Sequence, residues 1–325
     1  MKDIGIVGMP YTGKSTLFTA LTSSGASGGK SNQAVVDVPD PRVAALAAQE
    51  RSKKIVHAKV RFVDVPGGLT AQGIAEFRQT DALCLVVRGF GPDAQPEVEL
   101  GNLHAELILA DLATIEGGVE KGRKKARGSA EGKAELAALE KAQALLEGEQ
   151  PLRAGSWDPE ELKVFKGYAP LTLKPWIVVV NTEEGADGSP AIPDAIALSA
   201  ALEAEVAGLE AAEAAELLAG YGVDEPGLGR VIDSCYRALD LITFLTTGED
   251  ETRAWEVRRG AKAPEAAGVI HSDLERGFIR AEVIGYDELV ATGGWDAAKT
   301  SGKLRVEGKD YVMNEGDIVN IRFAV

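Results

Sequence analysis

Short apolar runs, each followed by polar residues, recur along the first part of the chain. Residues 4–7, 82–87 and 176–180 form continuous apolar runs, which are typical of parallel strands covered on both faces. Two further strands are expected at residues 59–63 and 195–198. The pattern predicts an α/β fold built on a doubly wound sheet, in which ligands bind at the carboxyl ends of the strands.

Between about residue 103 and residue 147 the apolar spacing becomes that of a helix. Apolar side chains recur in two sets, Ile108, Leu112, Ile115 and Val119, then Leu136, Leu139 and Leu146. A turn containing Gly128 separates the two sets. Two amphipathic helices joined by a short turn predict an antiparallel α-helical hairpin.

Beyond about residue 249 the pattern is mixed. We expect strands at residues 268–270, 280–284 and 317–323, and short helices at residues 287–290 and 295–300. This mixture predicts a separate, smaller unit that contains both strands and helices.

The composition of the 325 residues narrows the class of protein. Such a length is enough for two or three domains. The two cysteines are too few for a disulfide framework and favour a reducing compartment. No apolar run reaches the ~18 residues of a membrane-spanning helix, and the first residues lack a signal-peptide pattern. We therefore expect a cytoplasmic protein with no membrane partner.

The net charge of −15 repels nucleic acid over most of the surface. The acidic chain nevertheless contains one local basic cluster. It consists of Lys121, Arg123, Lys124, Lys125 and Arg127, with Lys133 close by. It lies at the expected tip of the hairpin. One interpretation is a contact with RNA or the ribosome, and the other is a solvated helix end.

The motif G-x-x-x-x-G-K-S follows the first expected strand and precedes a helical pattern at residues 16–21. In this context it predicts a phosphate-binding loop, whose backbone N–H groups cradle phosphate oxygens at a helix N-terminus. We expect Lys14 to reach the terminal phosphates as a catalytic residue, and the Ser15 hydroxyl to bind Mg²⁺. The expected nucleotide-binding residues of this loop are Gly8, Met9, Pro10, Tyr11, Thr12, Gly13, Lys14, Ser15 and Thr16.

The strand expected at residues 59–63 runs into a D-x-x-G sequence, from Asp64 to Gly67. We expect Asp64 to hold Mg²⁺ through water, and the Gly67 N–H to sense the γ-phosphate as part of the catalytic machinery. The sequence shows no cluster with metal-ligand spacing and no Ser-His-Asp set.

Candidate base-binding residues follow the last two expected strands. Asn181 and Glu184 belong to an N-x-x-E sequence, at the place where GTP-binding proteins carry N-K-x-D and the Asp accepts two hydrogen bonds from guanine. Thr182 replaces the Lys and Glu184 replaces the Asp, which weakens the case for strict guanine selection. Ser199 and Ala200 resemble the later base-contacting loop of such proteins.

These motifs, in this order and together with longer matches, resemble the YchF-type NTPases of the Obg-related P-loop family. The matches are residues 38–42 (VPDPR), 86–88 (VVR), 199–205 (SAALEAE), 241–244 (LITF), 253–255 (RAW), 262–271 (KAPEAAGVIH), 275–283 (ERGFIRAEV), 302–305 (GKLR) and 307–312 (EGKDYV). The resemblance therefore extends over nearly the whole chain.

The resemblance implies a P-loop NTPase domain (1–102 and 173–246), an inserted helical hairpin (103–172) and a C-terminal TGS domain of β-grasp shape (247–325). It also implies binding and hydrolysis of ATP, with GTP tolerated and Mg²⁺ as the cofactor. Members of the family associate with ribosomes and are linked to translation and stress responses. A ribosome or RNA contact is therefore expected through the hairpin tip, from Lys121 to Arg127, and through the TGS domain.

Two departures from the family pattern bear on the mechanism. The family's Thr that closes over Mg²⁺ has no counterpart in residues 23–32, which are rich in Gly and Ser. Gly68 and Leu69 follow the D-x-x-G sequence, and neither can orient water as the Gln of Ras does. We therefore expect slow intrinsic hydrolysis, on the order of the unassisted Ras rate of ~10⁻⁴–10⁻³ s⁻¹.

Three alternatives stay open. Besides a slow ATPase, the sequence is compatible with a nucleotide-binding scaffold that has negligible hydrolysis, with a GTP-preferring GTPase, and with a small-molecule kinase. The last needs an acceptor pocket and a general base, and the sequence offers no constellation for either.

Overall fold

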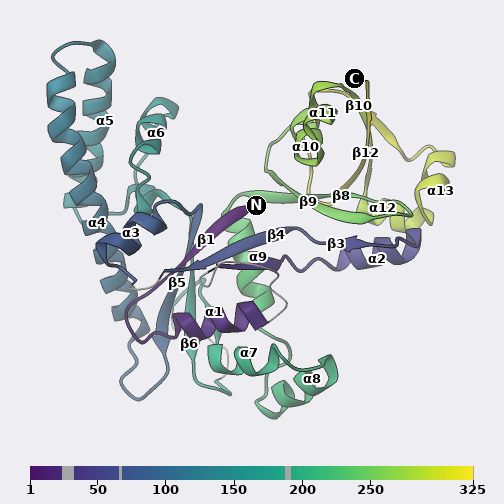
Figure 1. Cartoon of the computed structure of the whole chain (residues 1–325), viewed down its shortest axis with the longest axis horizontal. Coiled ribbons are helices and arrows are strands. Elements are labelled where there is room, and N and C mark those ends of the chain that lie inside the picture. Colours follow the sequence, from purple (N-terminus) through teal and green to yellow (C-terminus); the bar gives the residue numbers. More distant parts are fainter. Residues whose placement is uncertain (24–32, 66–67, 187–191, 325) are drawn as a thin grey trace. The chain divides into compact units, whose positions relative to one another are not determined.

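The computed structural model describes residues 1–23, 33–65, 68–186 and 192–324 (Figure 1). The chain gathers into two compact units. The first unit consists of Lys2–Val36 and Arg61–Val231, and the second of Met1, Asp37–Val60 and Ile232–Val325. Both units are therefore discontinuous in sequence. The three-domain division expected from the family resemblance stays a prediction.

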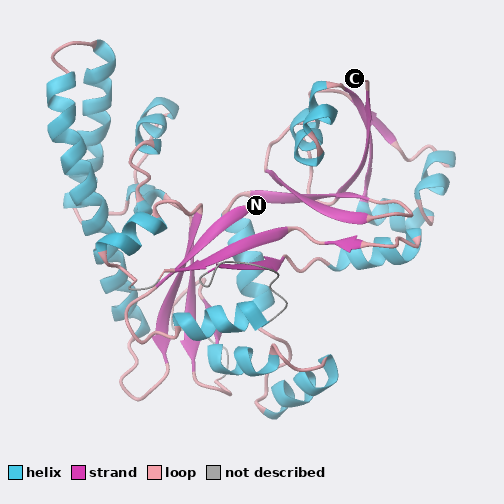
Figure 2. Ribbon diagram, viewed as in Figure 1, coloured by secondary structure: helices cyan, strands magenta, loops and turns pink. Residues whose placement is uncertain are grey.

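The first unit is built on a sheet with the strand order β2-β4-β1-β5-β6-β7. Figure 2 draws the strands in magenta and the helices in cyan. Strand β1 pairs in parallel with β5, β5 with β6, and β6 with β7. The apolar runs supply these central strands, in which Ile6, Cys84 and Val179 are fully buried. The predicted α/β fold with a doubly wound sheet is confirmed.

The bounds of the elements in this unit follow the expected ranges closely. Its strands are β1 (Lys2–Val7), β2 (Gln33–Asp37), β4 (Lys59–Asp64), β5 (Ala82–Gly89), β6 (Trp176–Thr182) and β7 (Ile196–Leu198). Its helices are α1 (Lys14–Ser23), α3 (Ala71–Phe77), α4 (Pro96–Lys125), α5 (Ala130–Glu147), α6 (Pro159–Lys166), α7 (Ala200–Val206) and α8 (Ala211–Gly220), with 3₁₀ turns η1 (Leu152–Ala154) and η2 (Leu171–Leu173).

Helices α4 and α5 form the predicted antiparallel hairpin (Figure 1). Ile115, Val119 and Leu139 belong to a buried apolar cluster that the two helices share with η1 and α6. Ser129 caps α5 by accepting a hydrogen bond from the Gly132 N–H at 3.0 Å. Helix α4 begins seven residues before the expected position of 103, because Pro96 suits the first turn of a helix.

The second unit contains a sheet with the strand order β11-β10-β12-β8-β9-β3. Its strands are β3 (Ile55–Val56), β8 (Leu241–Thr246), β9 (Thr252–Arg258), β10 (Phe278–Gly285), β11 (Arg305–Glu307) and β12 (Asp317–Phe323). Its helices are α2 (Pro41–Glu50), α10 (Ala263–Ile270), α11 (Ser272–Arg276), α12 (Tyr286–Thr292) and α13 (Trp295–Thr300), while α9 (Leu228–Ala238) crosses from the first unit into the second. Among the helices of the described ranges, none is long and apolar enough to cross a membrane.

The strand expected at residues 268–270 is wrong, because these residues end helix α10. Pro264 lies in the first turn of this helix, and the Glu265 carboxylate accepts a hydrogen bond from the Lys262 N–H at 3.1 Å. Ala263, Ala266 and Ala267 are buried against the second sheet's core. Their i, i+3, i+4 spacing is that of a helix, and a run of three apolar residues carries no period of its own.

Candidate nucleotide-binding site

The loop between β1 and α1 needs glycine at two positions. A Cβ on Gly8 would lie 2.3 Å from the Val86 carbonyl oxygen. Gly13 has φ +86°, and a Cβ there would lie 2.1 Å from Nδ2 of Asn181. Both glycines of the motif therefore let the loop pass close to the strands beside it.

Lys14, the first residue of α1, turns back across this loop. Its Nζ donates a hydrogen bond to the Met9 carbonyl at 2.7 Å, and the Thr12 hydroxyl donates to the same oxygen at 3.1 Å. Burial lowers the pKa of Lys14, and the negative charge of Asp64 raises it. The ammonium group thus lies inside the loop, at the N-terminus of a helix, where it can meet an anion.

A cavity of about 460 Å³ opens beside Lys14, and we call it the phosphate-side cavity. Its lining residues are Gly8, Met9, Pro10, Lys14, Ser15, Asp64, Val65, Gly68 and Leu69. Burial raises the pKa of Asp64, while Lys14 and a hydrogen bond from Ser15 lower it. A hydroxyl and a carboxylate side by side are hard oxygen donors of the kind that Mg²⁺ takes alongside phosphate oxygens and water.

A second cavity, of about 480 Å³, lies on the other side of the loop, and we call it the base-side cavity. It is lined by Gly13, Thr16, Phe90, Asn181, Thr182, Glu183, Glu184, Ser199 and Ala201. All of its lining side chains come from the carboxyl ends of strands or from the elements that follow them. This is the edge at which a doubly wound sheet binds its ligand.

Asn181 at the end of β6 joins three segments. Its Nδ2 donates to the Thr12 carbonyl at 3.0 Å, and its Oδ1 accepts from the Ala200 N–H at 2.8 Å. The neighbouring Glu183 accepts from the Gly91 N–H at 2.9 Å. Glu183 thus holds the loop after β5, whereas Glu184 lies in the cavity wall and is hydrogen-bonded to Tyr221.

The structure brings together most of the residues singled out in the sequence. Ser199 caps α7 by accepting from the Leu202 N–H at 3.3 Å. Ala200 contributes its N–H to Asn181. Tyr11 is 91% exposed. Gly67, with its predicted catalytic role, lies outside the described residues.

Phe90 in the base-side cavity was not among the expected site residues. It directly follows β5, at the same sheet edge as Asn181. Its place after a parallel strand is the signal that could have identified it.

Family models match both ends of the chain. A model described as a 50S ribosome-binding GTPase matches residues 3–109. The YchF-GTPase C-terminal model, described as a protein of unknown function, matches residues 241–324. The two matches cover the phosphate loop and most of the second unit.

Curated relatives are similar over the full length. A protein of Haemophilus ducreyi named ribosome-binding ATPase YchF is 40% identical, covering 99% of each chain. The protein of the same name from Bacillus subtilis is 37% identical, again covering 99% of each chain. The solved structure of the Schizosaccharomyces pombe YchF GTPase superposes with a TM-score of 0.89 at 32% identity, covering 99% of this chain and 97% of that one. With such similarity along its whole length, this chain belongs to the YchF family of P-loop NTPases.

Proposed function

We propose that the protein is a slow, Mg²⁺-dependent ATPase that tolerates GTP and acts as a nucleotide-dependent switch on the ribosome. The observation that carries this proposal is the Lys14 ammonium, held inside a glycine loop beside the phosphate-side cavity. The relatives are named ribosome-binding ATPases, which supports both the hydrolysis of ATP and the binding of the ribosome. A role in stress responses stays a prediction from the family resemblance.

The geometry suits transfer of a phosphoryl group to water. The bond between the γ-phosphorus and the β–γ bridging oxygen breaks, and water attacks from the opposite side. Lys14 and the backbone N–H groups of the loop stabilise the negative charge that develops on the phosphate oxygens. Ser15 and Asp64 would hold Mg²⁺, which when bound neutralises charge on the β- and γ-phosphates.

We expect slow hydrolysis because, among the described residues that line the phosphate-side cavity after Asp64, none is suited to position the attacking water. Gly68 and Leu69 line the phosphate-side cavity, and neither carries a side chain that can accept a proton or orient water. Catalysis then depends on charge stabilisation alone unless a partner contributes.

The choice of ATP over GTP depends on the base-side cavity. Guanine presents two adjacent donors to a carboxylate, whereas adenine presents one exocyclic amine. Glu184 extends one methylene further than the Asp of strict GTP-binding proteins. The relatives are named ATPases, while the yeast structure is described as a GTPase. Calorimetry with each nucleotide and Mg²⁺ tests the preference, and tight GTP binding without ATP binding would overturn it.

Removing the Lys14 amine tests the proposed hydrolysis. We expect the wild type to release phosphate from ATP at about 10⁻⁴–10⁻³ s⁻¹, the range of an unassisted GTPase, and Lys14→Ala to fall to background. Lys163→Ala serves as the control, because Lys163 is exposed on α6 and pairs only with Glu160 among the described ion pairs. Equal background rates in wild type and Lys14→Ala would favour the scaffold alternative. Turnover of several per second without a partner would contradict slow hydrolysis.

The hairpin tip is the proposed ribosome contact, with the TGS domain as a second. Lys121, Lys124 and Arg127 are exposed at the end of α4 and in the turn after it. Arg123 and Lys125 form long ion pairs across the hairpin, at 3.9 and 3.4 Å. A basic tip on an acidic protein is the local electrostatic signature of phosphate binding.

Reversing three of these charges tests the contact. The variant K121E/K124E/R127E is expected to bind ribosomes more weakly in co-sedimentation. Loss of three phosphate contacts should also reduce the slope of log affinity against log salt by about 2–3. K163E, a single reversal away from the tip, is the control and is expected to bind as the wild type. Unchanged affinity and slope for the triple variant would identify the tip as a merely solvated helix end.

A further inference from the structure

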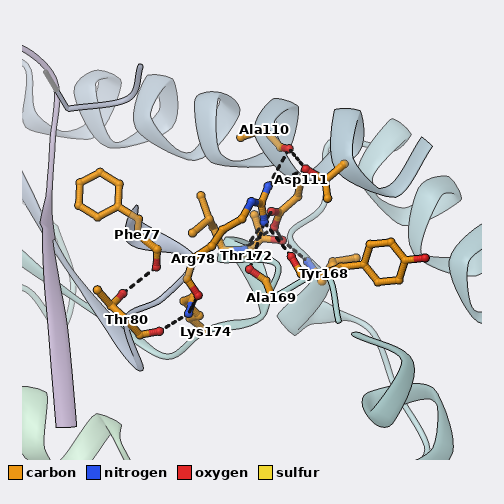
Figure 3. A network of polar contacts seen from close by, with 12 residues as sticks. Phe77, Arg78, Thr80, Ala110, Asp111, Tyr168, Ala169, Thr172 and Lys174 are labelled. Atoms are coloured by element: carbon orange, nitrogen blue, oxygen red, sulfur yellow. Dashed lines mark hydrogen bonds and ion pairs between the residues drawn. The ribbon is translucent and has the colours of Figure 1, made fainter. Parts of the chain in front are cut away.

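A buried polar junction joins the end of α3 to the base of the hairpin (Figure 3). Arg78 caps α3 and reaches into α4. Its Nη1 donates to Asp111 at 2.8 Å and to the Ala169 carbonyl at 3.1 Å, and its Nη2 donates to the Ala110 carbonyl and the Thr114 hydroxyl, both at 2.9 Å. Only 13% of the Arg78 side chain is exposed. Its planar donor fork therefore fixes α3 against one turn of α4.

Asp111 is fully buried and has further partners besides Arg78. Its Oδ1 accepts from the Leu171 N–H at 2.9 Å. Its Oδ2 accepts from the Thr172 N–H at 2.7 Å and from the Thr172 hydroxyl at 2.8 Å. The carboxylate thus ties α4 to η2, the segment that leads into β6, and every lone pair has a donor close by.

A second contact holds the same end of α3. Lys174, just before β6, donates from Nζ to the carbonyls of Arg78 and Thr80. The Thr80 hydroxyl donates to the Phe77 carbonyl at 2.8 Å. The end of α3 is therefore held from two sides by residues of the segment around η2 and of α4.

The junction lies between the phosphate-side cavity and the hairpin tip. The seven residues of α3 follow Gly68 and Leu69, which line that cavity, so Arg78 lies about 10 Å along the helix from it. In the other direction, α4 continues from Asp111 to its end at Lys125, a distance of about 20 Å. Helix α3 and the part of α4 from Asp111 to Lys125 thus connect the site to the tip through one ion pair.

We propose that Arg78 is a positioning residue that couples the hairpin to the hydrolytic site, so that a change at the γ-phosphate shifts the hairpin and a ribosome on the tip changes the hydrolysis rate. A buried ion pair with several hydrogen bonds has few alternative arrangements. A small movement of one helix that it joins is therefore transmitted to the other helix as a change between discrete arrangements. The inference rests on the proposed ATPase activity and ribosome contact. It adds the residues through which the hydrolytic site and the hairpin tip are coupled.

Hydrogen exchange of α4 and α5 tests the route without a ribosome. In the wild type, amides near the tip are expected to exchange at different rates with a non-hydrolysable ATP analogue and with ADP. In Arg78→Met this difference should disappear, while analogue affinity stays within about twofold. Arg153→Met is the matched control, because Arg153 donates to the Lys174 carbonyl at 2.5 Å and stacks on Trp176, and its hydrogen bonds and ring contacts within the described ranges do not include a residue of α3. It should keep the difference.

Phosphate release with and without ribosomes supplies the second readout. Arg78→Met is expected to keep the basal rate and the ribosome affinity and to lose the ribosome-dependent change in rate. Thr114→Val removes one acceptor of Arg78 in a side chain of similar shape, and a partial loss in this variant supports the proposal even if Arg78→Met does not fold.

The outcomes separate two failures. A wild type that neither hydrolyses ATP nor binds ribosomes would contradict the proposed function. A wild type that does both, with Arg78→Met and Thr114→Val responding as it does, would overturn the coupling alone.

Discussion

Asn181 shows how a single side chain can shape a site by joining the loops around it. Its amide carries N–H donors on Nδ2 and an acceptor on Oδ1. Nδ2 donates to the Thr12 carbonyl, and Oδ1 accepts from the Ala200 N–H. An aspartate of the same size would face the carbonyl with a second acceptor and repel it. The asparagine of N-x-x-E therefore joins the phosphate loop, at Thr12, to the start of α7, at Ala200.

Lys174 gives a pH-dependent prediction at the same scale. Burial lowers its pKa from the ordinary 10.5 to about 8. Between these values the unfolded chain binds more protons than the folded one, so this group's contribution to the free energy of unfolding rises with pH. Relative to Lys174→Met, the wild type should gain roughly 1 kcal/mol between about pH 8 and pH 10.5, after allowance for partial exposure.

Urea unfolding of both proteins across that pH range measures the gain. Lys163→Met, which alters an exposed lysine on α6, should show no trend relative to the wild type. A flat difference for Lys174→Met as well would mean that Lys174 titrates as a solvated amine.

The hairpin helices contain an internal comparison at the scale of one element. Gly117 and Gly118 are neighbours in α4, but a Cβ on Gly117 would meet nothing within 4 Å, whereas a Cβ on Gly118 would lie 2.7 Å from the Tyr168 ring. We expect Gly117→Ala to raise the free energy of unfolding by up to ~1 kcal/mol, through helix propensity. Gly118→Ala should lower it by about 1–3 kcal/mol, through overpacking.

Denaturant titrations followed by circular dichroism check the pair of glycines. Each variant is the control for the other, since the two positions differ only in what faces them. Equal effects of the same sign would show that Tyr168 does not pack against α4 in solution.

The sequence predicted those elements whose pattern is local. The hairpin and the central strands carry their own period over many residues, and the phosphate loop is a contiguous motif. Residues 268–270 were misassigned because three apolar residues have no period. The Arg78–Asp111 pair was not foreseen, because its members lie 33 positions apart and a charged residue on an amphipathic helix ordinarily faces water.

At the scale of the whole molecule, nucleotide binding should stabilise one unit selectively. Both cavities are lined by residues of the first unit. Mg²⁺ and nucleotide at about 100 times the dissociation constant should add about 2.7 kcal/mol to its stability. Hydrogen exchange is then expected to slow in β5 and β6, and to stay unchanged in β10 and β12. Uniform slowing in all four strands would show that the two units unfold together.

The division into units could not be predicted from the sequence, because it depends on contacts between distant segments. Arg42 at the start of α2 pairs with Asp40 beside it and with Glu315, 273 positions away. An arginine and a glutamate so far apart in the sequence carry no local pattern that would predict their ion pair. The family resemblance predicts which types of domain are present, whereas the structure shows which distant segments pack together.

The interrupted course of the chain limits how the protein can be dissected. Residues 37–60 belong to the second unit although they lie within the first part of the sequence. A fragment starting at residue 247 would lack β8, which lies between β12 and β9, and the outer strand β3. Such a fragment would expose unpaired strand edges, which are prone to aggregate. Neither half of this protein can be excised whole by a single cut.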